Sequence, residues 1–521
     1  MRITKYTYYI YIAVLLLFCQ QVSAQRIIRR NSRHYVAQLG LPDRVDPILQ
    51  DRWHQEPPYN SLCPIDTITN KRSVVGCVAT SMSQVMHYWQ WPERYDWDNM
   101  LDNYEKKDYT DEQVNAVAQL ALDCGQSVKM KYTSSASGAR SVYQAMALAN
   151  EYEYNRGLQM YFRDFYSLEE MTLMLKKELA AGRPVLVSGY RKTDGHAFVI
   201  DGYDERDWFH VSWGNPRGIG NEYTYLPYLS PDLPGYNSYL DSPENGYNVL
   251  QMFTIGVMPN NHPFATNIER HNYGFGGFIA HEDSVIVQNM SNVGWNMHED
   301  SVSLMLMHNG ERVCPLYTYS RQFLLEEVDD TAYTDTLILR MPEDIADGTY
   351  TILPMYRDNA EDGGKEWREV RTSVGMPNYL IASVKDGEAT FSSDTASIAY
   401  LTLEDVDFPD FLVDKSKPDY SLRFRNHGPE MAGQVYLFME SLDVLGKDFY
   451  LQEQGITVGA DEEFVVHNKL TPLNVPKEGT YKLHIFYSSN LFGEELEELE
   501  WEDSPIVTIL PVSAIELAMK R

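Results

Sequence analysis

Cysteine is scarce in this chain of 521 residues, and positive charge is outnumbered. Five cysteines are too few for a small disulfide-stapled scaffold. Lysine and arginine total 44 against 74 acidic residues, which gives a formal net charge of -30. Such a charge repels nucleic acid and anionic membranes. The composition therefore argues against nucleic acid as a partner, while leaving enzymes and protein-binding modules open.

Long apolar runs are absent except near the N-terminus. There, Arg2 and Lys5 precede an apolar run from Ile10 to Phe18. The small-residue sequence Val22-Ser23-Ala24 follows it, a pattern typical of a bacterial secretory signal cut after Ala24. The run is shorter than the roughly 20 residues of a membrane-spanning helix. We expect a signal peptide over 1–24, a short leader over 25–48, and a secreted chain, extracellular or periplasmic, with no membrane span.

Cofactor and metal motifs are also missing. The sequence has no glycine-rich phosphate-binding loop, and its acidic clusters lack the glycine-punctuated pattern of a calcium loop. His87 and His210 form no recognisable metal-ligand spacing with His196, so packing or surface roles are expected for both. We predict no metal and no organic cofactor. Four cysteines remain after the signal, and their pairing stays open: Cys63, Cys77, Cys124 and Cys314.

The first half of the sequence has the pattern of an α+β domain. Apolar residues from Cys77 to Trp89 recur at helical spacing, and Pro92 follows. A capping box, Ser167 with Glu170, opens a second predicted helix that ends near Gly182. Short strands are predicted over 185–187, 196–200 and 208–213. We place this α+β domain at residues 49–260.

The second half has short alternating segments separated by turns, which is typical of β-sandwiches. Asp347-Gly348-Thr349-Tyr350 recurs as Glu478-Gly479-Thr480-Tyr481, at an offset of 131 residues. Asn292-Val293-Gly294 recurs as Asn426-His427-Gly428, at an offset of 134 residues. Two similar offsets indicate a duplicated module. We therefore predict two all-β, immunoglobulin-like sandwich domains, at 261–392 and 393–521, as spacers or binding surfaces.

The residues that suggest chemistry surround one cysteine. Cys77 follows Gly76 directly before the first predicted helix, where free amides and the helix dipole stabilise a thiolate. His196 comes 119 residues later, next to the small Gly195, and an imidazole there could accept the thiol proton. Gln55 lies 22 residues before Cys77, and its side-chain amide could join the Cys77 backbone N–H in an oxyanion hole.

These residues stand in motifs that resemble the streptopain family, bacterial relatives of papain. The matching motifs run in the family's order over residues 50 to 258: Gln55-x-x-Pro58-Tyr59-Asn60, Gly76-Cys77-Val78-Ala79-Thr80, Gly125-x-Ser127-Val128-x-Met130-x-Tyr132, Gly195-His196-Ala197-Phe198-Val199-Ile200-Asp201-Gly202 and His210-Val211-Ser212-Trp213-Gly214.

The resemblance implies a papain-like fold and assigns roles to individual residues. It implies Cys77 and His196 as the catalytic pair, Gln55 in the oxyanion hole and Trp213 packed beside the histidine. It also implies that Ser135 and Ser137, in the 134–138 loop, border the substrate cleft together with Gly195.

One segment departs from the family pattern. Family members usually have Asn-Trp-Gly-Trp-Gly where this chain has Ser212-Trp213-Gly214-Asn215-Pro216. The asparagine that would hold the imidazole in its tautomer is therefore missing, and Trp213 is expected only to shield the pair.

We predict a secreted cysteine endopeptidase that hydrolyses protein or peptide substrates through an acyl-thioenzyme. The altered 212–216 segment leaves an alternative open: a catalytically weakened, peptidase-like adhesin or binding protein whose β-modules contact a host or surface ligand. A transferase using the same acyl-enzyme is a third interpretation, because the nucleophile does not decide which molecule accepts the acyl group.

Overall fold

The computed structural model describes residues 40–510 with internal gaps. The gaps are 192–193, 217–220, 228, 230–245, 282–283, 297–299, 322, 324–332, 359–365, 414–417, 445–447, 471–477, 490–495, 500 and 502–503. The predicted signal peptide at 1–24 lies outside the described residues, as does most of the predicted leader.

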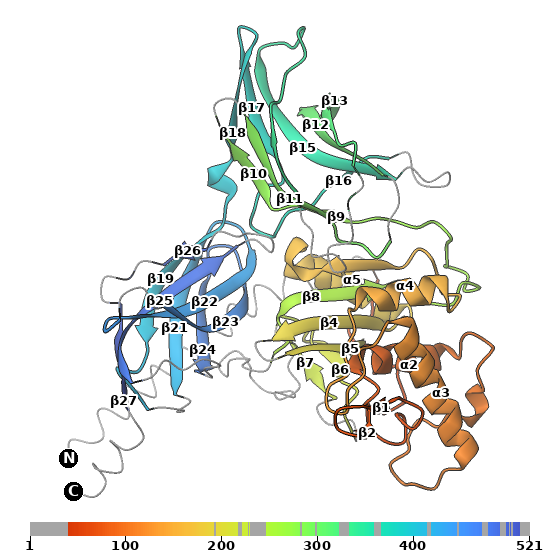
Figure 1. Ribbon diagram of the computed structural model, residues 1–521. Coiled ribbons are helices and arrows are strands. Elements are labelled where there is room, and N and C mark those ends of the chain that lie inside the picture. Colours follow the sequence, from red (N-terminus) through yellow and green to blue (C-terminus); the bar gives the residue numbers. More distant parts are fainter. Residues whose placement is uncertain are drawn as a thin grey trace, which may run out of the picture.

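The first domain consists of one antiparallel sheet with helices on both faces (Figure 1). Its helices are α2 (Cys77–Trp89), α3 (Asp111–Ser127), α4 (Val142–Asn150) and α5 (Leu168–Ala180), with the 3-10 turns η1 (Trp97–Asn99) and η2 (Arg163–Phe165). The six sheet strands, in spatial order, are β3 (Gln159–Phe162), β8 (Val249–Ile255), β4 (Val185–Arg191), β5 (Asp194–Tyr203), β6 (Phe209–Ser212) and β7 (Tyr223–Thr224). A separate hairpin pairs β1 (Ile65–Asp66) with β2 (Lys71–Arg72).

Alternation along the strands explains the two layers of helices. Leu186 and Val199 belong to the apolar core that includes residues of α2, α3 and α4. Their neighbours Val187 and Phe198 belong to a second core that includes residues of α5. Successive side chains of a strand point to opposite faces, so the sheet separates the two sets of helices.

The elements predicted from the sequence are confirmed. Helix α2 has the predicted bounds, and α5 begins at the predicted capping box, where the Ser167 hydroxyl accepts from the Glu170 N–H at 3.2 Å. Strands β4, β5 and β6 cover the predicted strands to within a few residues, and β5 is longer than predicted. Helix α3 begins at a second capping box, Thr110 with Gln113, which the sequence analysis did not use.

Two β-units follow the first domain, each with its own apolar core. In the first unit, one sheet contains β9 (Tyr273–Gly274), β10 (Gly277–Ala280), β11 (Val285–Asn292) and β14 (Tyr333–Leu337). The other contains β12 (Asp300–His308), β13 (Glu311–Thr318), β15 (Gly348–Asp358), β16 (Arg368–Glu369), β17 (Leu380–Lys385) and β18 (Glu388–Ser393).

The second unit also has two sheets, and the turn η4 (Thr395–Ser397) precedes it. One sheet contains β19 (Tyr400–Asp407), β21 (Asp419–His427) and β24 (Glu463–Lys469). The other contains β20 (Phe411–Val413), β22 (Met431–Ser441), β23 (Asp448–Val458), β25 (Gly479–Ser488), β26 (Glu497–Glu498) and β27 (Ile506–Leu510), all antiparallel except the β20–β27 pair. The repeated Gly-Thr-Tyr opens β15 in one unit and β25 in the other.

Both β-units contact the first domain (Figure 1). Trp295 of the first unit is 1% exposed within the core of the first domain, and its indole N–H donates to the Leu158 carbonyl at 2.8 Å. Glu430 of the second unit accepts from the Leu168 N–H at 2.7 Å. Both β-units therefore pack against the first domain and are not connected to it by the chain alone.

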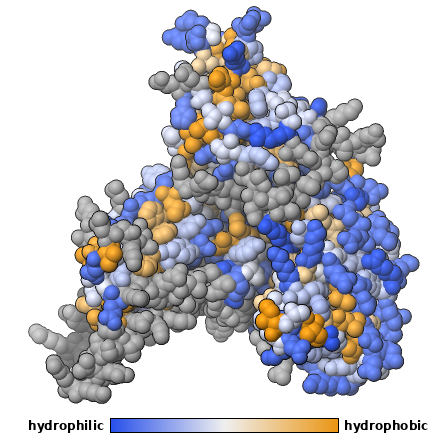
Figure 2. Space-filling model, in the orientation of Figure 1, coloured by the Kyte–Doolittle hydropathy of each residue, from blue (hydrophilic) through white to orange (hydrophobic). Residues whose placement is uncertain are grey.

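Figure 2 shows a mostly hydrophilic surface over the helices of the first domain, with an apolar spot over the β1–β2 hairpin. Ile65 and Ile68 of that region are 45% and 93% exposed. Among the helices that the structure describes, none is long and apolar enough to cross a bilayer.

Candidate active site

The backbone at Gly76 sets the position of Cys77. Gly76 precedes α2 with a φ of 92°, a backbone conformation that residues other than glycine rarely adopt. A Cβ at this position would also lie 3.0 Å from the Ser137 carbonyl oxygen. Gly76 supplies no side-chain cap, and the first turn of α2 has no acidic residue. The free amides and the positive end of the helix dipole therefore act on the Cys77 thiol.

The imidazole of His196 lies against this thiol. His196 is on β5, and its imidazole interacts with the Cys77 thiol closely enough that each side chain shifts the pKa of the other. Its Nε2 lies 2.8 Å from the Trp213 carbonyl oxygen. A carbonyl can only accept, so Nε2 carries a proton and Nδ1 is the nitrogen that remains for the thiol. The Trp213 carbonyl thus holds the tautomer, a role for which the sequence analysis found no residue after the loss of the family asparagine.

The pKa values of the pair move toward a charged thiolate and imidazolium. Burial by itself raises the pKa of Cys77, but the hydrogen bond and charge of His196, with the backbone N–H groups of Ala197 and Val78, outweigh it and lower that pKa. Burial likewise lowers the pKa of His196, but the Cys77 hydrogen bond and charge, the Trp213 carbonyl and the charge of Asp194 raise it overall. The site therefore favours an activated nucleophile.

Asn221 holds the backbone of Trp213. The Trp213 N–H donates to Asn221 Oδ1 at 2.9 Å, and Trp213 is 1% exposed. Behind it, the buried Gln84 of α2 donates to both Ser212 Oγ at 3.0 Å and Asp51 Oδ1 at 2.8 Å. This polar network ties the helix that begins at Cys77 to β6, which ends at Ser212, next to Trp213.

An aromatic group surrounds the imidazole. The ring centroids of His196 and Trp213 lie 6.2 Å apart at an interplanar angle of 17°, so Trp213 lies beside the histidine as predicted. The ring centroids of Tyr247 and His196 lie 5.3 Å apart. The Trp213 and Tyr247 rings therefore form an aromatic wall beside the imidazole.

The backbone places Gln55 near Cys77. The Val75 N–H donates to the Gln55 carbonyl at 3.0 Å, two residues before Cys77. Gln55 itself is partly buried. This pairing brings the Gln55 segment to the N-terminus of α2, and the oxyanion role of its side chain stays a prediction.

The predicted substrate-binding residues differ in their exposure to solvent and in their contacts. Ser135 is exposed, whereas Ser137 is buried and donates to the Val74 carbonyl at 2.7 Å. The Ser137 hydroxyl is thus engaged within the loop. At Gly195, a Cβ would lie 2.8 Å from the Tyr190 ring, so the missing side chain makes room for Tyr190 as well. The roles of all three residues in substrate binding stay predictions.

Asn221, Tyr247 and Asp194 were not singled out from the sequence. Asn221 and Tyr247 lie on loop segments without a motif, and Asp194 begins β5, two residues before the strand predicted from the sequence. Their positions follow from the pairing of distant strands.

His87 and His210 each contact a single carboxylate: His87 lies 3.4 Å from Asp51, and His210 lies 2.6 Å from Asp201.

Cys63, Cys77, Cys124 and Cys314 are all free thiols, which settles the pairing of these four cysteines. Cys63 and Cys124 are buried, and burial raises the pKa of the Cys63 thiol to about 11 and that of the Cys124 thiol to about 12. Cys77 differs from both because its pKa is lowered. Among the cysteines of the first domain, Cys77 is therefore the candidate nucleophile.

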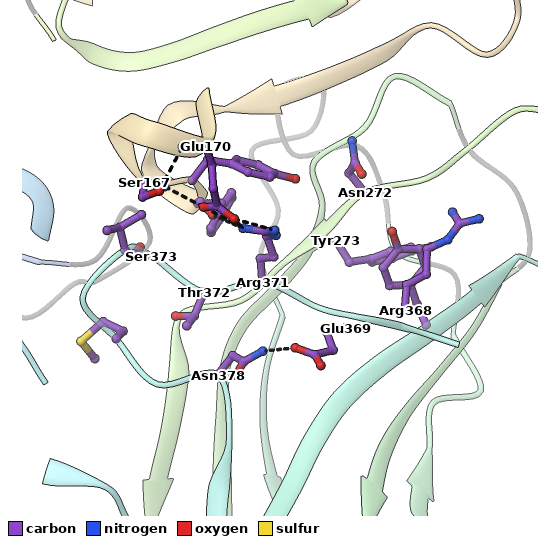
Figure 3. Close-up of a pocket in the computed structure, with 15 residues that line it drawn as sticks. Ser167, Glu170, Asn272, Tyr273, Arg368, Glu369, Arg371, Thr372, Ser373 and Asn378 are labelled. Atoms are coloured by element: carbon purple, nitrogen blue, oxygen red, sulfur yellow. Dashed lines mark hydrogen bonds and ion pairs between the residues drawn. The ribbon is translucent and has the colours of Figure 1, made fainter. Parts of the chain in front are cut away.

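A cavity of about 600 Å³ lies away from this pair, between η2–α5 and the first β-unit (Figure 3). Its charged side chains are already in contact with other side chains: Arg371 bonds Glu170 at 3.2 Å, and Asn378 donates to Glu369 at 3.0 Å. Its lining residues include neither a cysteine nor a histidine. We therefore place the chemistry at Cys77 and His196.

A thiol at a helix N-terminus, paired with a strand histidine in this α+β arrangement, defines the class of papain-like cysteine peptidases. Residues 53–223 match the model of the peptidase C10 family. The chain therefore contains a domain that matches the peptidase C10 family and is similar in sequence to streptopain.

Two curated relatives and one solved structure illustrate the similarity. The thiol protease/hemagglutinin PrtT of Porphyromonas gingivalis is 28% identical over 399 residues, which cover 69% of this chain and 44% of that protein. Streptopain of Streptococcus pyogenes is 26% identical over 277 residues, covering 44% of this chain and 68% of streptopain. The structure of active interpain A cysteine protease from Prevotella intermedia is 28% identical, covers 42% of this chain and 96% of its own, and superposes with a TM-score of 0.38. The chain thus spans less than half of PrtT.

Proposed function

We propose that this chain is a secreted endopeptidase that cleaves peptide bonds through an acyl-thioenzyme, with Cys77 as nucleophile and His196 as acid and base. The observation that carries the proposal is the Cys77–His196 pair, in which each side chain shifts the pKa of the other toward the charged form, with His196 Nε2 held by the Trp213 carbonyl at 2.8 Å. This arrangement leaves one ring nitrogen free to exchange a proton with the thiol.

The steps follow from the pair. The Cys77 thiolate attacks the scissile carbonyl carbon, and the carbonyl oxygen becomes an oxyanion that accepts from the Cys77 N–H and the Gln55 amide. The His196 imidazolium gives its proton to the leaving amine as the C–N bond breaks. Water then attacks the thioester while His196 takes a proton from it, and the acid product leaves with regeneration of the pair. Each step uses groups of the chain and water.

Labelling with an epoxysuccinyl thiol inhibitor tests this function. We expect one adduct at Cys77 in the reduced protein, none in Cys77→Ala, and loss of peptide cleavage in that variant. The buried Cys63 and Cys124 act as internal controls, because their thiols stay protonated. An intact protein that cleaves no unfolded polypeptide and carries no adduct at Cys77 contradicts the proposal.

We also propose the domain limits and localisation predicted from the sequence: a signal at 1–24, a leader at 25–48, a peptidase domain at 49–260, and immunoglobulin-like modules at 261–392 and 393–521. Support comes from the separate apolar cores around 273–384 and 399–509. N-terminal sequencing of protein exported by an expression host tests the cut after Ala24. Retention of the apolar segment in the exported protein contradicts it.

A second function for the β-modules is favoured by one relative. PrtT is named a thiol protease/hemagglutinin, and its similarity extends over 69% of this chain, beyond the 53–223 match. We propose that the β-modules bind a surface ligand independently of catalysis. Haemagglutination by the Cys77→Ala variant at the unmodified level supports this function, and absence of haemagglutination by both proteins contradicts it.

A further inference from the structure

Segment 246–248 joins the catalytic histidine to a distant part of the chain. Tyr247 is 5% exposed and packs against His196, Trp213 and Phe198, at centroid distances of 5.3, 5.8 and 6.0 Å. The Arg191 guanidinium lies 4.7 Å from the Tyr247 ring centroid. The Tyr247 backbone carbonyl accepts from the buried Gln251 amide at 2.9 Å. A displacement of this segment would therefore move the aromatic wall that supports the imidazole.

The next residue, Asn248, touches the second β-unit. Its amide Nδ2 donates to the Gly455 carbonyl at 3.2 Å. A Cβ added to Gly455 would lie 2.3 Å from the Asn248 carbonyl oxygen, about 1 Å closer than the 3.4 Å at which ordinary contact begins. The obstacle is backbone, which cannot rotate away as a side chain can. Gly455 thus permits an approach that any other residue would prevent.

Strand geometry explains why the contact forms at this point. Gly455 is on β23, which pairs with β22 and is an edge strand among the described strands of its sheet. An edge strand presents unpaired carbonyls along its outer side, and Asn248 satisfies one of them. The contact lies 378 residues from Cys77 in sequence.

A second contact fixes the same β-unit in place. Glu430, at the turn before β22, accepts from the Leu168 N–H at 2.7 Å and lies 3.4 Å from the Arg163 guanidinium. Arg163 is 4% exposed and also contacts Thr457 of β23 at 3.5 Å. With these anchors near one end of β23, a forced separation at Gly455 is transmitted to segment 246–248 instead of being absorbed by free movement of the unit.

We propose that the second β-unit is a positioning element of the active site: the backbone of β23 at Gly455 supports segment 246–248 and thereby holds Tyr247 against His196. The proposal rests on the proposed function, because it concerns the efficiency of the same catalytic pair. Gly455 and Asn248 act through Tyr247 and touch no reacting atom. Peptidase activity therefore depends on a module that resembles a separate appendage in the sequence.

The test is Gly455→Ala in the full chain, with peptide hydrolysis measured over a range of substrate concentrations. A misplacement of about 1 Å at a catalytic group can cost up to about 100-fold in rate. We expect kcat to fall by between about 10-fold and about 100-fold, with KM changed by less than about threefold, because the imidazole moves and the substrate-binding loop does not. Asn248→Ala, which removes the hydrogen bond without a clash, should lower kcat in the same direction by a smaller factor.

The matched control is Gly433→Ala on β22. A Cβ there would lie 2.2 Å from the Ser488 carbonyl oxygen, so it strains the same β-unit without touching the peptidase domain. We expect Gly433→Ala to lower the thermal midpoint of unfolding while kcat stays within about twofold. Equal losses of kcat in Gly433→Ala and Gly455→Ala overturn the proposal, as does unchanged kcat in both Gly455→Ala and Asn248→Ala.

These results are distinguishable from a failure of the proposed function. If the unmodified chain cleaves no peptide and is not labelled at Cys77, the peptidase assignment fails, and this inference fails with it. If the unmodified chain is active and labelled while the Gly455 and Asn248 variants match it, only this inference is overturned.

Discussion

Replacement of Asn221 by alanine is the sharpest test of how the site works without its usual asparagine. The variant removes the acceptor of the Trp213 N–H at 2.9 Å, while the Trp213 carbonyl still holds His196 Nε2 at 2.8 Å. Leaving a buried donor without its partner costs about 1–3 kcal/mol. At about 1.4 kcal/mol per factor of ten, a loss expressed wholly in the transition state corresponds to about 5-fold to about 150-fold in kcat.

The assay compares Asn221→Ala with Asn221→Asp. Aspartate retains an oxygen that can accept from the Trp213 N–H, so it should recover most of kcat, whereas alanine should not. Steady-state hydrolysis gives kcat and KM, and the rate of Cys77 alkylation against pH reports the state of the ion pair. Equal kcat and equal alkylation profiles in Asn221→Ala and the unmodified chain would refute the reasoning that this backbone hydrogen bond orients His196.

Three further predictions follow from the same contacts. The Cys77 pKa is lowered from its ordinary 9.0 and the His196 pKa is raised from 6.5. We therefore expect Cys77 alkylation by iodoacetamide to begin well below pH 9 and to shift to higher pH in His196→Ala. Peptide hydrolysis should fall again at alkaline pH as His196 loses its proton. An unmodified chain whose alkylation begins only near pH 9 contradicts this. Gly76→Ala forces a φ of 92° on alanine, so the free energy of unfolding should fall by about 1–3 kcal/mol and labelling of Cys77 should slow. An unchanged midpoint of thermal unfolding argues against strain at this turn. Trp295→Ala removes a side chain that is 1% exposed, and urea unfolding should show that the free energy of unfolding falls by about 3–5 kcal/mol. A decrease below about 1 kcal/mol would mean that the first β-unit does not pack on the first domain as described.

Local sequence patterns predicted the helices and strands that have one apolar face packed against a core. The apolar spacing of 77–89 and the capping box at Ser167 gave helices with the observed starts, because caps and amphipathic stripes are encoded within a few neighbouring residues. The extension of β5 to Asp194 and Tyr203 was not predicted, since pairing with β4 on one side and β6 on the other lengthens the strand. That extension positions Asp194 beside the active site.

The missing asparagine shows the limit of motif comparison. The sequence revealed that Ser212 stands where the family has asparagine, and it correctly predicted Trp213 beside His196. It could not reveal that a backbone carbonyl holds the imidazole. Every residue has a main-chain carbonyl, and every residue except proline has a main-chain N–H, so a hydrogen bond to the backbone leaves no mark on side-chain identity.

The sequence alone determined which cysteine and histidine form the candidate pair, the helix that begins at that cysteine and the change from an α+β to an all-β pattern. These depend on residue type and short-range periodicity, which are written in consecutive positions. Only the tertiary structure decided which atom orients the imidazole, which aromatic ring supports it and which strand of the second β-unit reaches that ring. Those contacts join Trp213 to Asn221 and Asn248 to Gly455. They depend on how strands and domains pack, and packing is a property of the whole chain.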